Sequence, residues 1–274
     1  MKRLVRADGP GLAADIARAD YGIDAPGVIR NLGVVGFVML AISLSSFVGF
    51  LPTELVMRPL GLVTIRFPLA TNGLIVALAF LGTGAWMYLG SRFGKLGERD
   101  RLLNTINWTG HERVLDVGCG RGLLLVGVAK RLTDGTVTGI DIWQSEDLSG
   151  NRADVPLRNA ERENVKERVT VQTADMRRLP FDADSFDVIV SRAAVHNLYA
   201  AADRATAIRE IARVLKPGGQ ALIADIRHHR EYAMTFAENG CRDVRLLDSK
   251  LVSVLCAMLT MGSLRPNTML VRKL

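Results

Sequence analysis

The sequence has 274 residues, 49% of them hydrophobic, which is enough for one full-sized domain and an additional module. Its three cysteines, Cys119, Cys241 and Cys256, lack redox or metal-ligand spacing, which argues against a disulfide framework and against a metal site. The formal charge of +7 is compatible with nucleic acid or an anionic membrane as a partner and does not choose between them.

Two long charge-free segments stand out in the first third of the chain. One is "NLGVVGFVMLAISLSSFVGFLPT", residues 31–53, and the other is "FPLATNGLIVALAFLGTGAWMYLGS", residues 67–91. Each contains about the 20 apolar residues that a helix needs to cross a bilayer. Acidic residues before the first segment argue against a cleaved signal peptide. We therefore expect two transmembrane helices; two buried helices of a soluble protein are the alternative.

Basic residues around these segments predict how the helices are oriented. The linker between them holds only Arg58 and Arg66, whereas the outer flanks are richer in Lys and Arg. Because basic flanks stay in the cytoplasm, we expect an integral membrane protein with both flanks on the cytoplasmic side. The predicted domains are a cytoplasmic segment at 1–30, a transmembrane hairpin at 31–91 and a cytoplasmic domain at 92–274.

After the hairpin, apolar strands alternate with charged helices. Strands are predicted at 112–117, 135–142, 168–175, 186–192 and 218–226, and helices at 122–132, 155–165 and 203–215. Strands that alternate with helices of this length predict an α/β fold with a doubly wound parallel sheet.

The first of these strands leads into a glycine-rich loop, "VLDVGCGRG", residues 114–122. Gly118, Gly120 and Gly122 permit a tight turn and a close approach of the backbone to a ligand at a helix N-terminus. Asp141, at the end of the next strand, is placed to bind ribose hydroxyls. These features alone fit a dinucleotide as well as another nucleoside cofactor.

Two further stretches, "TADMRRLPF" (173–181) and "RVLKPGGQALIADI" (213–226), complete a set of four motifs. The set resembles the class I S-adenosylmethionine-dependent methyltransferases, and in particular the ubiquinone/menaquinone biosynthesis methyltransferase group. The resemblance covers about residues 95–274. It implies a Rossmann-like seven-stranded doubly wound sheet whose last strand is antiparallel, with S-adenosyl-L-methionine as the cofactor.

The resemblance also implies a set of cofactor-binding residues. They are Asp116, Gly118, Cys119, Gly120, Gly122, Asp141, Ile142, Asp175, Met176, Ser191 and Arg192. Asp116 and the glycine loop would hold the methionine end, Asp141 the ribose, and Asp175 the adenine amino group. Asp175 as a turn carboxylate and Asp116 as a residue that binds only local backbone are the structural alternatives.

Candidate catalytic residues lie in "SRAAVHNLY", residues 191–199, just after the fourth strand. Ligands of such sheets bind at the carboxyl ends of the strands, so His196 is the first candidate base and Tyr199 the second. The alternative is that His196 and Asn197 only cap the next helix or satisfy backbone groups.

A membrane-tethered domain meets lipophilic molecules at high effective concentration. We therefore expect methyl transfer to a small lipophilic or lipid acceptor, such as a quinone, a phenol, a phospholipid amine or a thiol. A membrane-bound S-adenosylmethionine-binding sensor or scaffold with little turnover is the alternative from another class. The absence of a basic run argues against nucleic acid as a partner.

One apolar run near the C-terminus, "LVSVLCAMLTMGSL" (251–264), is too short to span a bilayer. It falls between two predicted antiparallel strands at about 243–249 and 267–274. We expect a surface that closes over the acceptor or enters the bilayer interface; a helix packed on the sheet is the alternative.

Overall fold

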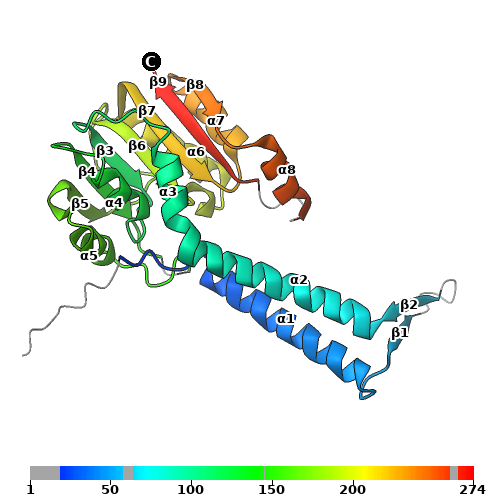
Figure 1. Cartoon of the computed structure of the whole chain (residues 1–274). Helices are drawn as coiled ribbons and strands as arrows, with labels where there is room; N and C mark the ends of the chain where they lie inside the picture. The colour runs from blue at the N-terminus through cyan, green and yellow to red at the C-terminus, as the bar shows by residue number, and fades with distance from the viewer. Residues whose placement is uncertain (1–18, 58–63, 145, 260–264) are drawn as a thin grey trace, which may run out of the picture.

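The structure, a computed structural model, describes residues 19–57, 64–144, 146–259 and 265–274. An α/β domain carries a long helical hairpin that projects from one end of its sheet (Figure 1). Of the expected N-terminal segment, residues 1–18 lie outside the described part of the chain, as do residues 260–264 of the apolar C-terminal run.

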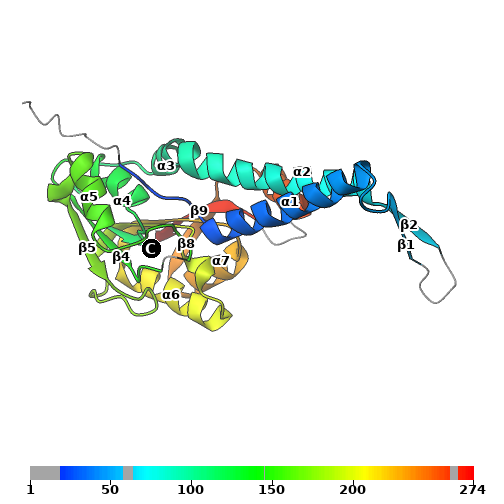
Figure 2. The ribbon, with the colours of Figure 1, turned by 90° about the horizontal axis from the view of Figure 1, so that it is seen from below.

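The hairpin consists of α1 (Pro26–Phe47) and α2 (Leu69–Leu89), which lie side by side along their length (Figure 2). At its far end, β1 (Glu54–Met57) and β2 (Ile65–Pro68) form an antiparallel ribbon. Both helices begin at an apolar stretch without acids, and Pro26 occupies the first turn of α1, where its missing N–H costs no hydrogen bond.

Small residues allow the two helices of the hairpin to pack closely. A Cβ added to Gly36 would lie 2.6 Å from Leu81, and one added to Gly73 would lie 3.1 Å from Ser43. The Ser43 hydroxyl donates to the Ala70 carbonyl at 2.5 Å. Close packing at small residues and hydrogen bonds from hydroxyl groups to the backbone are typical of helix pairs in membranes.

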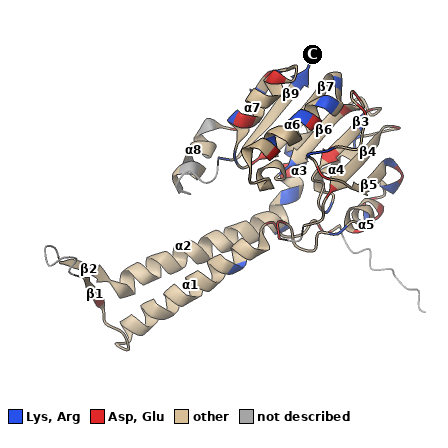
Figure 3. Cartoon of the chain, turned by 180° about the vertical axis from the view of Figure 1, so that it is seen from behind, with Lys and Arg blue, Asp and Glu red and all other residues tan. Residues whose placement is uncertain are grey.

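The outer surface of the hairpin is apolar and exposed. Phe37, Phe47, Ile75 and Trp86 are 65%, 58%, 64% and 80% exposed, and Figure 3 shows almost no charge along α1 and α2. Both helices are long and apolar enough to cross a membrane. In the most apolar 18-residue stretch of each, only 11% and 17% of the residues are buried. They are therefore not core helices of the α/β domain.

The second helix of the hairpin runs directly into the domain. A π-helical turn, η2 (Gly90–Gly94), joins α2 to α3 (Lys95–Leu103), and the chain bends there (Figure 1). A π turn disrupts the regular hydrogen-bond ladder and permits such a bend. Because Leu102 and Leu103 of α3 are fully buried in the domain, hairpin and domain are joined by a packed helix.

The domain contains a seven-stranded sheet in the order β5-β4-β3-β6-β7-β9-β8. Its strands are β3 (Arg113–Val117), β4 (Thr136–Asp141), β5 (Val169–Thr173), β6 (Phe186–Arg192), β7 (Leu215–Asp225), β8 (Cys241–Leu246) and β9 (Asn267–Lys273). The four pairings that join β5, β4, β3, β6 and β7 are parallel, and β9 runs antiparallel to both of its neighbours. The mixed sheet with an antiparallel last strand is confirmed.

Helices cover both faces of this sheet, and alternate residues of the strands point into two cores. Val114 faces α3, α4 (Leu123–Ala129) and α5 (Val155–Arg162), whereas Leu115 faces α6 (Ala201–Val214) and α7 (His229–Glu238). Parallel strands buried on both faces explain why the sequence shows continuous apolar runs here. The carboxyl ends of the parallel strands meet at the edge from which the hairpin extends (Figure 1).

The apolar run after β8 forms α8 (Lys250–Leu259) at the same edge of the sheet. Leu251, Val254 and Met258 of this helix are 75%, 49% and 73% exposed. These side chains are spaced along one helical face. The alternative for this run was a helix packed on the sheet; the structure shows a helix over residues 250–259 whose Leu251, Val254 and Met258 side chains are exposed.

Candidate functional site

The glycine loop after β3 adopts a conformation that side chains would prevent. Gly118, Gly120 and Gly122 have φ angles of 73°, 51° and 86°, in the left-handed region that favours glycine. A Cβ at Gly118 would lie 2.3 Å from Ala194 Cβ, so this loop lies tightly against the segment that follows β6. The loop leads directly into the N-terminus of α4.

Asp141, at the end of β4, organises this loop. Its Oδ2 accepts from Gly120 N at 2.8 Å, and its Oδ1 accepts from Trp143 N at 2.6 Å and from Asn151 Nδ2 at 3.2 Å. The carboxylate that was predicted to bind ribose therefore also holds the backbone of the glycine loop in place.

Asp116 is the most perturbed carboxyl group of the site. It is 2% exposed on β3, and its Oδ2 has no hydrogen-bond partner among the described residues. Burial, with the nearby Asp141 charge, raises the pKa of Asp116 to about 8. A buried, unpartnered carboxyl oxygen is rare and fits a site for a cationic group.

Three further predicted cofactor residues have partners within the protein. Cys119 is buried, and burial raises the pKa of its thiol well above its usual range. Ser191 donates its hydroxyl to the Val117 carbonyl at 2.8 Å and so joins β6 to β3. The Arg192 guanidinium pairs with Glu98 of α3 at 2.6 Å. These contacts give Ser191 and Arg192 a structural role.

Asp175 and its neighbours lie beyond β5. Both carboxylate oxygens of Asp175 contact the Arg177 side chain, with the shortest distance 2.6 Å, and Arg177 holds the pKa of Asp175 below its usual value. Asp175 lines an open cavity of about 610 Å³ that extends to Asp182. Met176 is half-buried beside the core, and Ile142 is 48% exposed at the end of β4.

His196 contacts a carboxylate that sequence reasoning did not single out. Its Nδ1 lies 2.5 Å from Asp225 Oδ1, and the Asp225 side chain is 1% exposed at the end of β7. The other oxygen, Oδ2, accepts from His196 N at 3.1 Å and from the Tyr232 hydroxyl at 3.2 Å. The Asp225 carboxylate thus lies against the imidazole and holds the His196 backbone, while Nδ1 itself makes no hydrogen bond within the described residues.

Tyr199 is not part of this cluster. It is 99% exposed, and its carbonyl accepts from Arg204 at 2.7 Å. The 3₁₀ turn η4 (Val195–Asn197) ends before Leu198, and the chain then leads to α6. The structure therefore brings His196 to the site and leaves Tyr199 in solvent.

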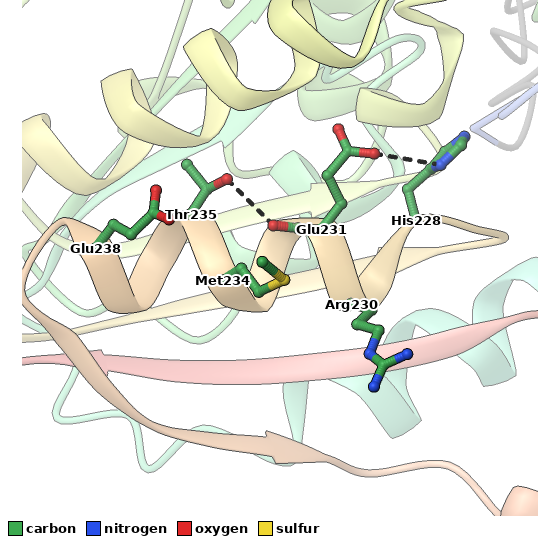
Figure 4. A pocket seen from close by; sticks show the side chains of 6 residues that line it. All are labelled: His228, Arg230, Glu231, Met234, Thr235 and Glu238. Carbon is green, nitrogen blue, oxygen red and sulfur yellow. Dashed lines mark hydrogen bonds and ion pairs between the residues drawn. The ribbon is translucent and has the colours of Figure 1, made fainter.

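His228 lines a separate groove along α7. The groove has a volume of about 450 Å³, and Figure 4 shows its lining side chains, all of which come from α7 and the residue before it. His228 Nδ1 lies 3.5 Å from Glu231 Oε2 in this groove. None of the predicted cofactor residues lines it.

The family comparison agrees with this geometry. A family model described as "Methyltransferase domain" matches residues 115–223, from the second residue of the glycine-loop motif to Ile223 within β7. Residues 115–223 are a methyltransferase domain. The domain is of the class I S-adenosylmethionine-dependent type and contains the glycine loop, Asp141, Asp175 and His196.

Known proteins share this domain over part of their length. The methyltransferase GfsG from Streptomyces halstedii is 36% identical over 132 residues, which are 47% of this chain and 44% of that protein. The ubiquinone/menaquinone biosynthesis C-methyltransferase UbiE from Geotalea daltonii is 31% identical over 121 residues, 44% of this chain and 48% of that protein. The chain thus spans about half the length of these curated relatives.

A solved structure shows the same fold at lower identity. It is the geranyl diphosphate C-methyltransferase from Streptomyces coelicolor A3(2), in complex with Mg²⁺, geranyl diphosphate and S-adenosyl-L-homocysteine. The two chains are 17% identical with a TM-score of 0.52, over 70% of this chain and 83% of that one. At this identity the comparison shows the fold alone.

The residues of the methyltransferase domain fit S-adenosyl-L-methionine. The cofactor carries an ammonium group, and the unpartnered Oδ2 of buried Asp116 is suited to a cation. The three glycines of the loop at 118–122 permit a close approach of the backbone, and Asp141 offers a carboxylate for hydroxyl groups. Asp175 offers a carboxylate for an amino group if it shares its oxygens with Arg177.

Replacing Asp116 with Asn tests the charge at this position. Between the unfolded value of 3.8 and the folded pKa of about 8, the native protein binds more protons than the unfolded chain. Stability without cofactor therefore falls as pH rises through this range. In Asp116→Asn this fall should disappear, and the variant should be about 1–3 kcal/mol more stable than wild type at pH 8. Denaturant unfolding at several pH values measures the difference.

The same substitution should weaken cofactor binding. The charged hydrogen bond that it removes is worth about 1.5–3 kcal/mol, or about 10- to 100-fold in affinity. Calorimetric titration with S-adenosylhomocysteine checks this loss. A variant that keeps full affinity would show that Asp116 serves only the local backbone.

Proposed function

We propose that the chain is a membrane-anchored S-adenosylmethionine-dependent methyltransferase that transfers a methyl group directly to a small lipophilic or lipid acceptor. The observation that carries the proposal is the position of the site relative to the hairpin. The glycine loop follows β3, His196 follows β6 and Asp225 ends β7, so all three lie at the carboxyl edge of the sheet. The helices α1 and α2 leave the domain at this same edge (Figure 1).

Contacts between the hairpin ends and the site support this orientation. Before α1, the Asp24 carboxylate pairs with Lys95 at 2.8 Å, and the Asp24 backbone N–H donates to the Ser91 hydroxyl at 3.2 Å. After α2, Glu98 pairs with Arg192 of β6. With α1 and α2 in the bilayer, these contacts hold the site close to the membrane surface, where a lipophilic acceptor is concentrated.

The His196–Asp225 contact supports an acceptor that arrives protonated, such as a phenolic hydroxyl, an enol or a thiol. Bound S-adenosyl-L-methionine supplies an activated methyl group on a sulfonium with a neutral leaving group. The acceptor's proton passes to His196, and the freed electron pair forms the new bond to the methyl carbon. When bound, S-adenosyl-L-methionine would release the methyl group and keep the electron pair of the broken carbon–sulfur bond on its neutral sulfur. Asp225 then stabilises the protonated imidazole.

We further propose that α8 presents the acceptor from the bilayer surface. The helix follows β8 and precedes β9, whose first residue, Asn267, pairs with Asp225 at the site. The helix lies at the end of the sheet from which the hairpin extends (Figure 1). An apolar helical face beside an anchor is suited to the boundary between headgroups and acyl chains.

Replacing Leu251, Val254 and Met258 together with Ser tests this role of α8. All three side chains are exposed, so the folded domain loses little packing. We expect the KM for acceptor presented in vesicles to rise by about tenfold or more, since about 1.5–3 kcal/mol of apolar contact is lost per buried side chain. Affinity for S-adenosylhomocysteine should stay unchanged. Equal losses in both quantities would indicate misfolding and contradict the proposal.

A labelling experiment tests the proposed function as a whole. Purified full-length protein is incubated with native membranes and S-adenosylmethionine labelled in its methyl group, and the products are extracted into organic solvent. The proposal predicts label in the organic phase. Label found only in protein or RNA would contradict it, and tight cofactor binding without any turnover would support a sensor or scaffold instead.

A further inference from the structure

A short segment before the hairpin lies across the glycine loop. This segment, residues 19–25, is here called the strap; it continues directly into α1 at Pro26. Tyr21 of the strap is 8% exposed and belongs to the core on the α4 side of the sheet. The strap is therefore packed into the domain and not merely a linker to the anchor.

Arg121 of the glycine loop holds the strap on one side. Its Nε donates to the Asp20 carbonyl at 2.9 Å, and its Nη2 pairs with the Asp20 carboxylate at 2.6 Å. Asn159 of α5 donates to the carbonyls of both Asp20 and Arg121 at 2.9 Å. The strap, the glycine loop and α5 thus share one hydrogen-bond network. Gly22, with a φ of 71°, allows the close approach, because a Cβ there would lie 2.7 Å from Arg121 Cδ.

The strap also holds the loop that supports Asp141. Ile23 N donates to Ser149 Oγ at 2.8 Å, and Ala25 N donates to the Asp147 carbonyl at 2.9 Å. The same loop contains Asn151, whose Nδ2 donates to Asp141. Both loops that carry predicted cofactor contacts are therefore tied to the strap.

Lys95 and Arg192 hold the strap close to the point where the hairpin joins the domain. Lys95, 5% exposed at the start of α3, donates to the carbonyls of Tyr21 and Gly22 at 2.9 and 2.8 Å. The side chain of Asp24 lies between Lys95 and Arg192, at 2.8 and 3.5 Å. The two ends of the hairpin thus meet at the strap.

We propose that the strap is a component of the cofactor site, in which Asp20 and Lys95 act as positioning residues that preorganise the glycine loop and the Asp141 loop. This inference rests on the proposed function. Docking of the strap lowers the entropic cost of ordering both loops when the cofactor binds. Because the strap continues into α1, cofactor affinity depends on the position of the hairpin relative to the domain.

The variants Asp20→Asn and Gly22→Ala test the inference in the full-length protein in lipid nanodiscs. The first weakens the pair with Arg121, and the second displaces the strap without changing charge. Each should raise the Kd for S-adenosylhomocysteine by about tenfold. The KM for S-adenosylmethionine should rise in parallel, while kcat at saturating cofactor stays unchanged, because the strap touches neither His196 nor Asp225.

Asp243→Asn is the matched control for Asp20→Asn. It also removes a carboxylate that is paired with an arginine, Arg245, but on β8 at the far edge of the sheet. This control should bind S-adenosylhomocysteine as wild type does. A double-mutant cycle of Asp20→Asn with Arg121→Gln should show that the second substitution adds little once the first is present.

Two results would overturn the inference. One is wild-type affinity in both strap variants, and the other is a loss of affinity matched by loss of the folded state in thermal unfolding without cofactor. These outcomes are distinguishable from failure of the proposed function. If wild type binds S-adenosylhomocysteine and the strap variants bind it equally well, only the strap inference fails; if wild type does not bind it, the cofactor assignment fails.

Discussion

Replacing His196 with Ala should lower kcat by about 100- to 10,000-fold, the range expected for loss of a general base. The imidazole is 12% exposed and its Nδ1 lies 2.5 Å from Oδ1 of the buried Asp225, so a carboxylate stands beside it to balance a positive charge. Asp225→Asn keeps the shape of the partner but removes its charge, and it should give a smaller loss of kcat. Steady-state kinetics with saturating cofactor and acceptor measure both.

His111→Ala is the control for His196→Ala. His111 also contacts an aspartate, Asp134, but it lies before β3 and is exposed. Its removal should leave kcat unchanged. Affinity for S-adenosylhomocysteine should be unaffected in all three variants, because none of these residues belongs to the glycine loop. Full activity in His196→Ala would restrict His196 to capping the turn that begins at Val195, and the acceptor would then need no base.

Gly118→Ala should abolish useful cofactor binding. The added Cβ would lie 2.3 Å from Ala194 Cβ at a φ of 73°, so the variant combines steric overlap with a strained backbone. These two costs together amount to about 2–5 kcal/mol, which corresponds to an affinity loss on the order of 100-fold or more. Calorimetry with S-adenosylhomocysteine measures the loss.

Gly218→Ala separates the two costs. Gly218 has a φ of 80°, but no atom lies within 4 Å of an added Cβ. This variant has the backbone strain without the overlap and without contact to the cofactor loop. It should therefore lose some stability and keep its cofactor affinity. Normal binding in Gly118→Ala would contradict the role assigned to the glycine loop.

Local sequence patterns predicted the α/β domain well because its strands are buried on both faces. The run "FDVIVSR" was expected to form a strand at 186–192, and β6 spans these same residues. Strand β8 was placed less well, at about 243–249, whereas it spans Cys241–Leu246. It is an edge strand with mostly exposed residues, so its sequence carries little apolar pattern.

The site was harder to predict because its decisive contacts join distant parts of the chain. Asp225 lies in the motif "RVLKPGGQALIADI", at the end of a predicted parallel strand, and this position could have marked it as a site residue. Its contact with His196, however, depends on the pairing of β6 with β7. The contact of Asp20 with Arg121 joins residues about a hundred positions apart, and local patterns in the sequence do not indicate such a contact. Arg192 has the sequence position of a cofactor residue but contacts Glu98 of α3.

The hairpin illustrates the opposite case, in which composition alone indicated the helices. The charge-free segments contain most of α1 and all of α2, because uninterrupted apolar residues leave no polar face to place in solvent. Sequence gave no indication of the π turn at Gly90–Gly94, which redirects the chain into α3 and toward Arg192. That turn decides which edge of the sheet lies near the hairpin.

The central claim is methyl transfer to a lipophilic acceptor, and mass spectrometry of lipid extracts tests it most directly. Full-length protein in native membranes is supplied with S-adenosylmethionine whose methyl group is deuterated, alongside the Gly118→Ala variant. The wild type should produce a lipid-soluble species in which one hydrogen is replaced by the deuterated methyl group, and the variant should not. Incorporation confined to protein or nucleic acid, with the lipid extract unchanged, would contradict the claim.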